Sequence, residues 1–162
     1  MLYARGVVRL LVIVVAVSTA LVACNGSHSG RRPAAQFDQG LAEVTASFRA
    51  STEHIKSDGR AALASSDSSK VLAVYASLRD ATAAAAQRYH ELTPPAGKSE
   101  AFTALIKNID EQKAALDQVV QGAKKQQSST VATALRRYAS LLQQWAAALS
   151  RLGGVGSSGT TG

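Results

Sequence analysis

Cysteine is almost absent from this chain of 162 residues, which contains one, so no disulfide can form within it. Proline is also scarce, with three in all, and two of them stand together as Pro94-Pro95. A sustained alternation of Val, Ile and Thr with polar residues, which would predict strands, does not occur. These absences exclude a disulfide-stabilised fold and favour long helices, because few residues interrupt them.

The single cysteine, Cys24, lies shortly after the longest apolar run. Arg5 and Arg9 carry positive charge, and residues 10–17 are all apolar. A basic start followed by an apolar run of this length is typical of a secretory signal peptide, which is removed from the mature protein. We therefore leave residues 1–23 out of the fold.

The end of this leader resembles the lipobox of bacterial lipoproteins. Its four residues are Leu21, Val22, Ala23 and Cys24. The resemblance implies cleavage before Cys24, attachment of diacylglycerol and fatty acids such as palmitate, and a place on the extracytoplasmic face of the bacterial cell membrane. Two or more acyl chains hold a protein stably on a bilayer. Two alternatives are an uncleaved anchor over residues 7–23, about the shortest span of a bilayer, and an ordinary free thiol.

Charge excludes one large class of partners. Without Arg5 and Arg9, 16 basic residues remain against 11 acidic ones, a net charge of +5. The basic residues are spread out, whereas a nucleic-acid-binding protein concentrates them on one face. We expect no nucleic acid, although Arg31-Arg32 can meet anionic lipid headgroups just after the lipidation site.

The mature chain divides into three parts. Residues 24–34 are polar and rich in Gly and Ser, which predicts a flexible tether behind the lipidated cysteine. Residues 153–162 contain little that can be buried and predict a disordered tail. Residues 35–152 lie between them and form the one folded domain.

That domain shows four amphipathic segments, at about 35–64, 68–93, 99–127 and 129–152. Apolar residues recur at steps of three and four, as in Phe37, Leu41, Val44 and Phe48, and mark one face of a helix. Short connections between four such helices predict an all-α, antiparallel up-down four-helix bundle.

Local signals give the helix ends. Gly59 weakens the first helix, which is expected to end or kink there. Asp67 or Ser68 is expected to cap the second helix, and Ser128 or Ser129 the fourth. Pro94-Pro95 is expected to end the second.

The histidines do not suit a metal site. His54 follows Glu53, and His90 precedes Glu91, so the members of each pair point about 100° apart on a helix. Di-iron bundles instead place a Glu three residues before a His. We expect no metal and no cofactor. Neither a nucleophile with its base nor a phosphate loop occurs, so we also expect no enzymatic activity.

A further set of charged residues is expected on the protein surface. Asp110, Lys113 and Asp117 fall on one helix face at steps of three and four, which indicates solvated ion pairs. His54 and His90 are likewise expected to lie on the surface.

Four aromatic residues allow two interpretations. Tyr75, Tyr89, Tyr138 and Trp145 have both apolar rings and polar groups, so they are candidates to bind a small apolar ligand between the helices. The simpler interpretation is core packing with the polar atoms at the bundle edge. Nearby alanines favour packing, because they let helices approach closely.

A lipobox followed by a helical hairpin that breaks at Leu92-Thr93-Pro94-Pro95 resembles small alanine-rich lipoproteins of actinobacteria such as mycobacteria. Their functions are mostly undefined, so the resemblance implies a location in the cell envelope and an all-α domain. We expect a non-enzymatic protein-interaction or structural role in the cell envelope, with an envelope protein as partner. Val74 and Leu141 lie one position off their stripes and are expected to face that partner. The alternative is a carrier or sensor of a small apolar ligand such as a lipid.

Overall fold

The computed structural model describes residues 32–65 and 67–153, and these form an all-α four-helix bundle. The predicted leader and lipidated cysteine lie outside the described residues, as do most of the predicted tether and all of the predicted tail except Gly153. The four helices, with the short 3-10 helix η1, are α2 (Arg32–Ala64), α3 (Ser68–His90), η1 (Ala96–Lys98), α4 (Ser99–Lys124) and α5 (Ser128–Arg151). The described residues contain no strand, and the predicted fold class is confirmed.

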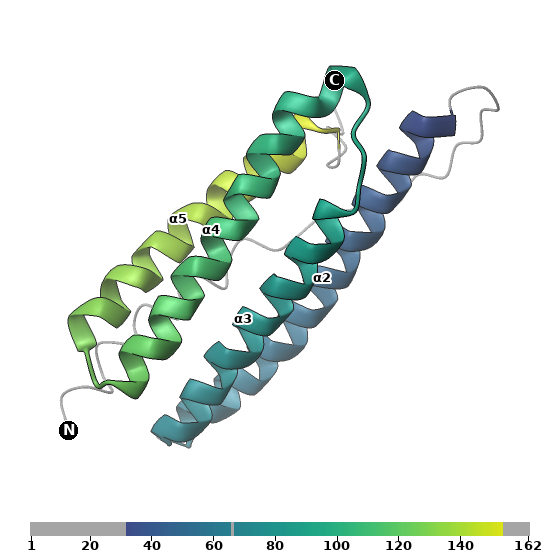
Figure 1. Ribbon diagram of the computed structural model, residues 1–162. Helices are drawn as coiled ribbons and strands as arrows, with labels where there is room; N and C mark the ends of the chain where they lie inside the picture. Colours follow the sequence, from purple (N-terminus) through teal and green to yellow (C-terminus); the bar gives the residue numbers. More distant parts are fainter. Residues whose placement is uncertain (1–31, 66, 154–162) are drawn as a thin grey trace, which may run out of the picture.

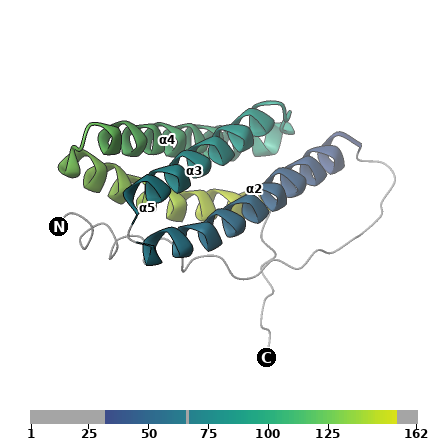
Figure 2. The ribbon, with the colours of Figure 1, turned by 90° about the horizontal axis from the view of Figure 1, so that it is seen from below.

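Successive helices run antiparallel and lie side by side (Figure 1). The closest backbone pairs are α4–α5, α2–α3 and α3–α4. The start of α2, the end of α3, η1, the start of α4 and the end of α5 meet at one end of the bundle, which we name the η1 end (Figure 1). The two tight connections lie at the opposite end, the far end. Figure 2 shows α2 and α4 on opposite sides of the molecule.

The helix starts differ from the predictions at two of four places. α2 begins at Arg32 rather than residue 35, because Pro33 falls in the first turn, where a missing N–H costs nothing. Asp67 caps α3 as predicted, and its carboxylate accepts from the N–H groups of Ser69 and Lys70. The predicted serine cap of α5 is wrong. The cap position falls on Gln127, whose side chain makes no capping hydrogen bond.

Two helices end about three residues earlier than predicted. α3 ends at His90, and Leu92 then packs so closely on Gly40 that a Cβ there would lie 2.7 Å from Leu92 Cδ2. α4 ends at Lys124 because Gln126 takes a left-handed backbone conformation, with φ of 56°.

The turn after α4 replaces helical hydrogen bonds with a Schellman pattern. The Gln127 N–H donates to the Gly122 carbonyl at 2.8 Å, and the Gln126 N–H donates to Ala123 at 3.1 Å. This pairing closes α4 and lets α5 begin at Ser128.

The core consists of three clusters, and α2 contributes to only one of them. The cluster nearest the η1 end takes Phe37, Leu41, Val44 and Phe48 from α2, together with residues of α3, α4 and α5. The other two clusters are built from α3, α4 and α5. Their buried members are Tyr75, Ala115, Leu116, Val119, Val120, Val131, Ala134, Leu135, Tyr138 and Leu141.

Beyond Phe48, α2 packs chiefly on α3. Gly59 and Ala62 are buried there, and their small size lets the two helices approach closely. The helix passes through Gly59 without ending, so the expected end at this residue is wrong. Packing against α3 compensates for the low helix propensity of glycine.

One predicted partner-facing residue is buried. Leu141 is 4% exposed and packs with Leu116 and Tyr138, because the close α4–α5 contact buries a wider stripe of α5 than the seven-residue repeat marks. Val74 is half-buried beside Gly59, so part of its side chain remains accessible.

Gly59→Ala is expected to stabilise the protein by about 1 kcal/mol, because alanine is the better helix former. The new Cβ would lie 3.5 Å from Val74 Cγ1, an ordinary contact. Gly122→Ala is the matched control, since its Cβ would lie 3.1 Å from Val131 Cγ2 and must displace it. Urea unfolding should show a clear gain for Gly59→Ala and a smaller gain or a loss for Gly122→Ala. Destabilisation by Gly59→Ala would contradict the α2–α3 packing.

Candidate functional site

The four aromatic residues proposed to bind a ligand lie in different parts of the core. Tyr89 and Trp145 share the cluster near the η1 end, Tyr75 lies in a cluster of the far half, and Tyr138 lies in the third. Each is between 0% and 7% exposed. The structure therefore brings Tyr89 and Trp145 together but does not gather all four around one place.

Trp145 connects α5 to α2. Its ring meets the Phe48 ring edge-on, with centroids 5.6 Å apart and planes at 80°. The Arg49 guanidinium lies 5.8 Å from the centroid of the same indole. Edge-to-face and cation–π contacts of this kind are each worth about 0.5–1.5 kcal/mol. Trp145 is thus a bridging core residue.

Tyr89 joins α3 to α2 through a buried polar contact. Its hydroxyl and that of Thr45 share a hydrogen bond of 2.9 Å. Burial raises the pKa of Tyr89, while Thr45 and the nearby Trp145 indole act in the opposite direction. The indole nitrogen itself forms no hydrogen bond of ordinary geometry within the described residues.

The other two tyrosines are held neutral by burial. Burial raises the pKa of both Tyr75 and Tyr138 well above the ordinary tyrosine value. The Tyr138 hydroxyl interacts with Thr82, whose own hydroxyl donates to the Leu78 carbonyl at 2.8 Å. The Tyr75 hydroxyl is buried with no hydrogen-bond partner among the described residues.

Two buried amides are polar residues that the sequence reasoning missed. Asn108 Nδ2 donates to the Leu141 backbone carbonyl at 3.1 Å, and Gln112 Nε2 donates to Asn108 Oδ1 at 2.7 Å. Gln112 is fully buried, and its Oε1 has no partner among the described residues. The signal was its place in the apolar stripe, between Ile109 and Leu116. Asn108 thereby links α4 to α5, and Gln112, one turn further along α4, holds the Asn108 amide in place for that hydrogen bond.

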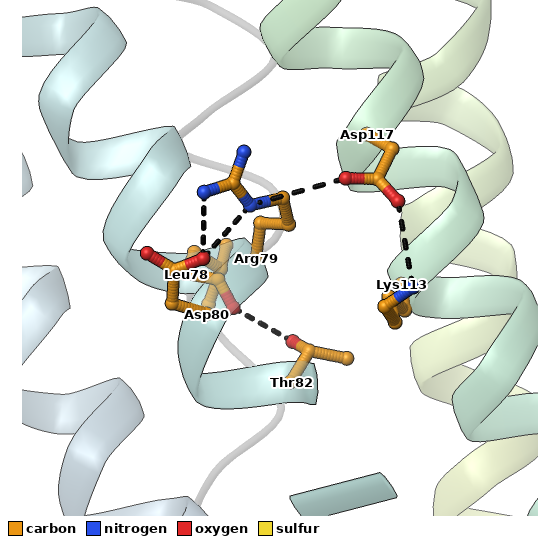
Figure 3. A network of polar contacts seen from close by, with 6 residues as sticks. All are labelled: Leu78, Arg79, Asp80, Thr82, Lys113 and Asp117. Carbon is orange, nitrogen blue, oxygen red and sulfur yellow. Dashed lines mark hydrogen bonds and ion pairs between the residues drawn. The ribbon is translucent and has the colours of Figure 1, made fainter. Parts of the chain in front are cut away.

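Ion pairs link α3 to α4 on the surface (Figure 3). Lys113 and Asp117 pair at 3.7 Å, as their spacing predicts, and Asp117 also lies 3.9 Å from Arg79 of α3. Arg79 binds Asp80 more closely, at 2.6 Å. Asp110, expected on the same α4 face, instead pairs across to His90 at 3.1 Å. Exposed pairs of this kind contribute less than about 1 kcal/mol each.

A groove of about 420 Å³ lies between α4 and α5, and we name it the α4–α5 groove. Its lining residues are Ala104, Lys107, Asn108, Glu111, Leu141, Gln144, Ala147, Ala148 and Arg151. Glu111 is paired with Arg137 at 3.3 Å. Lys107 and Arg151 have no acidic partner in the part of the chain that the structure describes. The groove therefore presents two uncompensated positive charges beside small apolar side chains.

Neither a metal-binding cluster nor a helix able to cross a bilayer is found in residues 32–65 and 67–153. No three His, Cys, Asp or Glu side chains in these ranges lie together in a way that can hold a metal ion. None of the helices there combines the length and the apolar character that crossing a bilayer requires.

Comparison with known protein families, with curated proteins and with solved structures finds no match to this chain.

Tyr138→Phe is expected to flatten the loss of stability at high pH. The folded state binds the Tyr138 proton more tightly than the unfolded state, so the contribution of this residue to stability is constant below about pH 10 and falls above it. Removing Tyr138 should reduce that slope by up to about 1.4 kcal/mol per pH unit. Urea unfolding between neutral and strongly alkaline pH measures it. An unchanged slope would show that the hydroxyl ionises freely in the folded state.

Proposed function

We propose that this protein is a lipid-anchored lipoprotein of the bacterial cell envelope whose helical bundle binds a protein partner without catalysing a reaction. The observation that carries the partner-binding part is an apolar surface on the far half of α2 and α3. The observation that carries the anchor is the leader that ends in Leu21-Val22-Ala23-Cys24.

The proposed anchor would hold the domain close to the membrane. Cys24 stands eight positions before Arg32, the first residue of α2. Eight residues span at most about 29 Å when fully extended. A lipid on Cys24 would therefore keep the η1 end within that distance of the bilayer.

The apolar surface lies where α2 leaves the shared core. Ile55, Leu63 and Val74 are half-buried and belong to none of the three core clusters. Ile55 and Leu63 are eight residues apart on α2 and flank Gly59, which packs beside Val74 of α3. We name these three residues the α2–α3 surface. Apolar side chains that stay accessible together are typical of protein-interaction sites.

The alternative role, a carrier of a small apolar ligand, has weaker support. It depends on Tyr75, Tyr89, Tyr138 and Trp145 lining one cavity, and these residues are distributed over three packed clusters. The α2–α3 surface requires no rearrangement of the core, so we favour the protein partner.

Cys24→Ala is expected to prevent lipidation and to leave an uncleaved precursor. Mass spectrometry of protein from host membranes should find wild-type chains that begin at Cys24 and carry diacylglycerol. Ser18→Ala is the matched control, because it changes the leader without touching residues 21–24, and it should be processed like the wild type. Normal cleavage and membrane retention of Cys24→Ala would refute the lipoprotein assignment.

A photo-crosslinking residue placed at Leu63 is expected to form one discrete protein adduct in host cells. The same residue at Gln118, exposed on α4, should form none, and Ile55→Lys should reduce the Leu63 adduct by placing charge on the same surface. Immunoblotting of the irradiated cells measures each adduct. Equal adducts at both positions, or repeated failure at Leu63, would count against the α2–α3 surface.

A further inference from the structure

The α4–α5 groove is lined by two basic side chains and by several small apolar ones. Lys107 comes from α4 and Arg151 from α5, so the two charges line the groove from different helices. Ala104, Ala147 and Ala148 line the same groove with small apolar side chains. The groove's volume of about 420 Å³ falls within the range of about 300–1,000 Å³ typical of small-molecule sites.

The charge of the groove is positive after its own ion pairs are taken into account. Its one carboxylate, Glu111, is neutralised by Arg137 at 3.3 Å. Asn108 is uncharged, and both ends of its amide are already paired, with the Leu141 carbonyl and with Gln112 Nε2. A ligand that complements Lys107 and Arg151 is therefore anionic. Both side chains are common ligands of phosphate, Arg as a planar fork and Lys as a point charge.

The position of the groove indicates where such an anion comes from. Ala104 and Glu111 lie five and twelve residues after Ser99, which places them about 8–18 Å from the start of α4. Arg151 is the last residue of α5. The groove thus occupies the η1 end, which the proposed anchor on Cys24 holds nearest the membrane.

We propose that the α4–α5 groove binds the phosphate group of an anionic membrane lipid, through Lys107 and Arg151. The alanines contact the apolar part of the lipid next to the phosphate. Only the choice of a lipid over a soluble phosphate ester rests on the proposed membrane anchoring. Occupation of this groove holds the η1 end of the α4–α5 pair at the membrane and leaves the α2–α3 surface, in the far half of the bundle, free for a partner.

The test uses the chain from residue 24 onward with Cys24→Ser, so that binding cannot come from the lipid anchor. The buried core lies entirely between Phe37 and Leu152, and this chain contains all of it. Sedimentation with phosphatidylcholine vesicles, with and without phosphatidylglycerol, measures membrane binding. The variant is Lys107→Gln/Arg151→Gln, and the control is Lys124→Gln/Lys125→Gln, which removes the same charge at the far end.

Wild type and control are expected to bind vesicles that contain phosphatidylglycerol with equal affinity. The groove variant should bind about thirty-fold more weakly, the value expected for two basic residues at an anionic surface. The control keeps its affinity because α4 is about 39 Å long, several Debye lengths at physiological salt. Circular dichroism checks that both variants keep their helices.

Two results would overturn the proposal. Equal losses in the groove variant and the control would show general attraction of a basic protein to an anionic surface. Failure of the wild type to bind these vesicles would exclude a membrane lipid as the ligand. If the wild type then bound soluble glycerol phosphate, the groove would be a site for a soluble phosphate ester. Neither result bears on Cys24, because the tested chain carries no lipid, so the anchor stands or fails separately.

Discussion

The contact between Phe48 and Trp145 is the interaction on which the closure of the bundle depends. Among the helices that the structure describes, α2 has α3 as its one close backbone neighbour, and it reaches the other two through large side chains. Phe48 meets Trp145 of α5 at 5.6 Å between ring centroids, and Phe37 meets Phe102 of α4 at 5.0 Å. Both contacts lie in the first half of α2. Aromatic rings span a wider gap than aliphatic side chains, so α2 joins the core without approaching α5 closely.

This arrangement divides α2 into two halves with different roles. The half before Phe48 completes the core cluster near the η1 end. The half after it lies on α3 through Gly59 and Ala62 and leaves Ile55 and Leu63 partly accessible. On the opposite side of the molecule, α4 and α5 are close neighbours, and Asn108, held in place by Gln112, bonds α4 to the Leu141 carbonyl of α5. The proposed partner surface and the proposed lipid groove therefore lie on different helix pairs, so both can be occupied together.

The spacing of apolar residues predicted the fold class and all four helices, because a helix that buries one face must repeat at three and four residues. Features that depend on pairs of helices were not predictable in the same way. The burial of Leu141 depends on how closely α4 and α5 pack, and the His90–Asp110 pair depends on their register across η1. Gln126 ends α4 although its residue type does not favour a positive φ. The α4–α5 groove likewise joins residues more than 30 positions apart, and neither helix alone predicts it.

Hydrogen exchange along α2 measures directly whether this helix is held firmly in its first half and only by α3 in its second. Amides between Phe37 and Phe48 are expected to be protected at least about tenfold more strongly than those between Thr52 and Leu63, since local opening follows the number of buried contacts. Uniform protection along α2 would contradict this expectation. That result would mean that the far half of α2 has a second neighbour in the core and that the α2–α3 surface is not free.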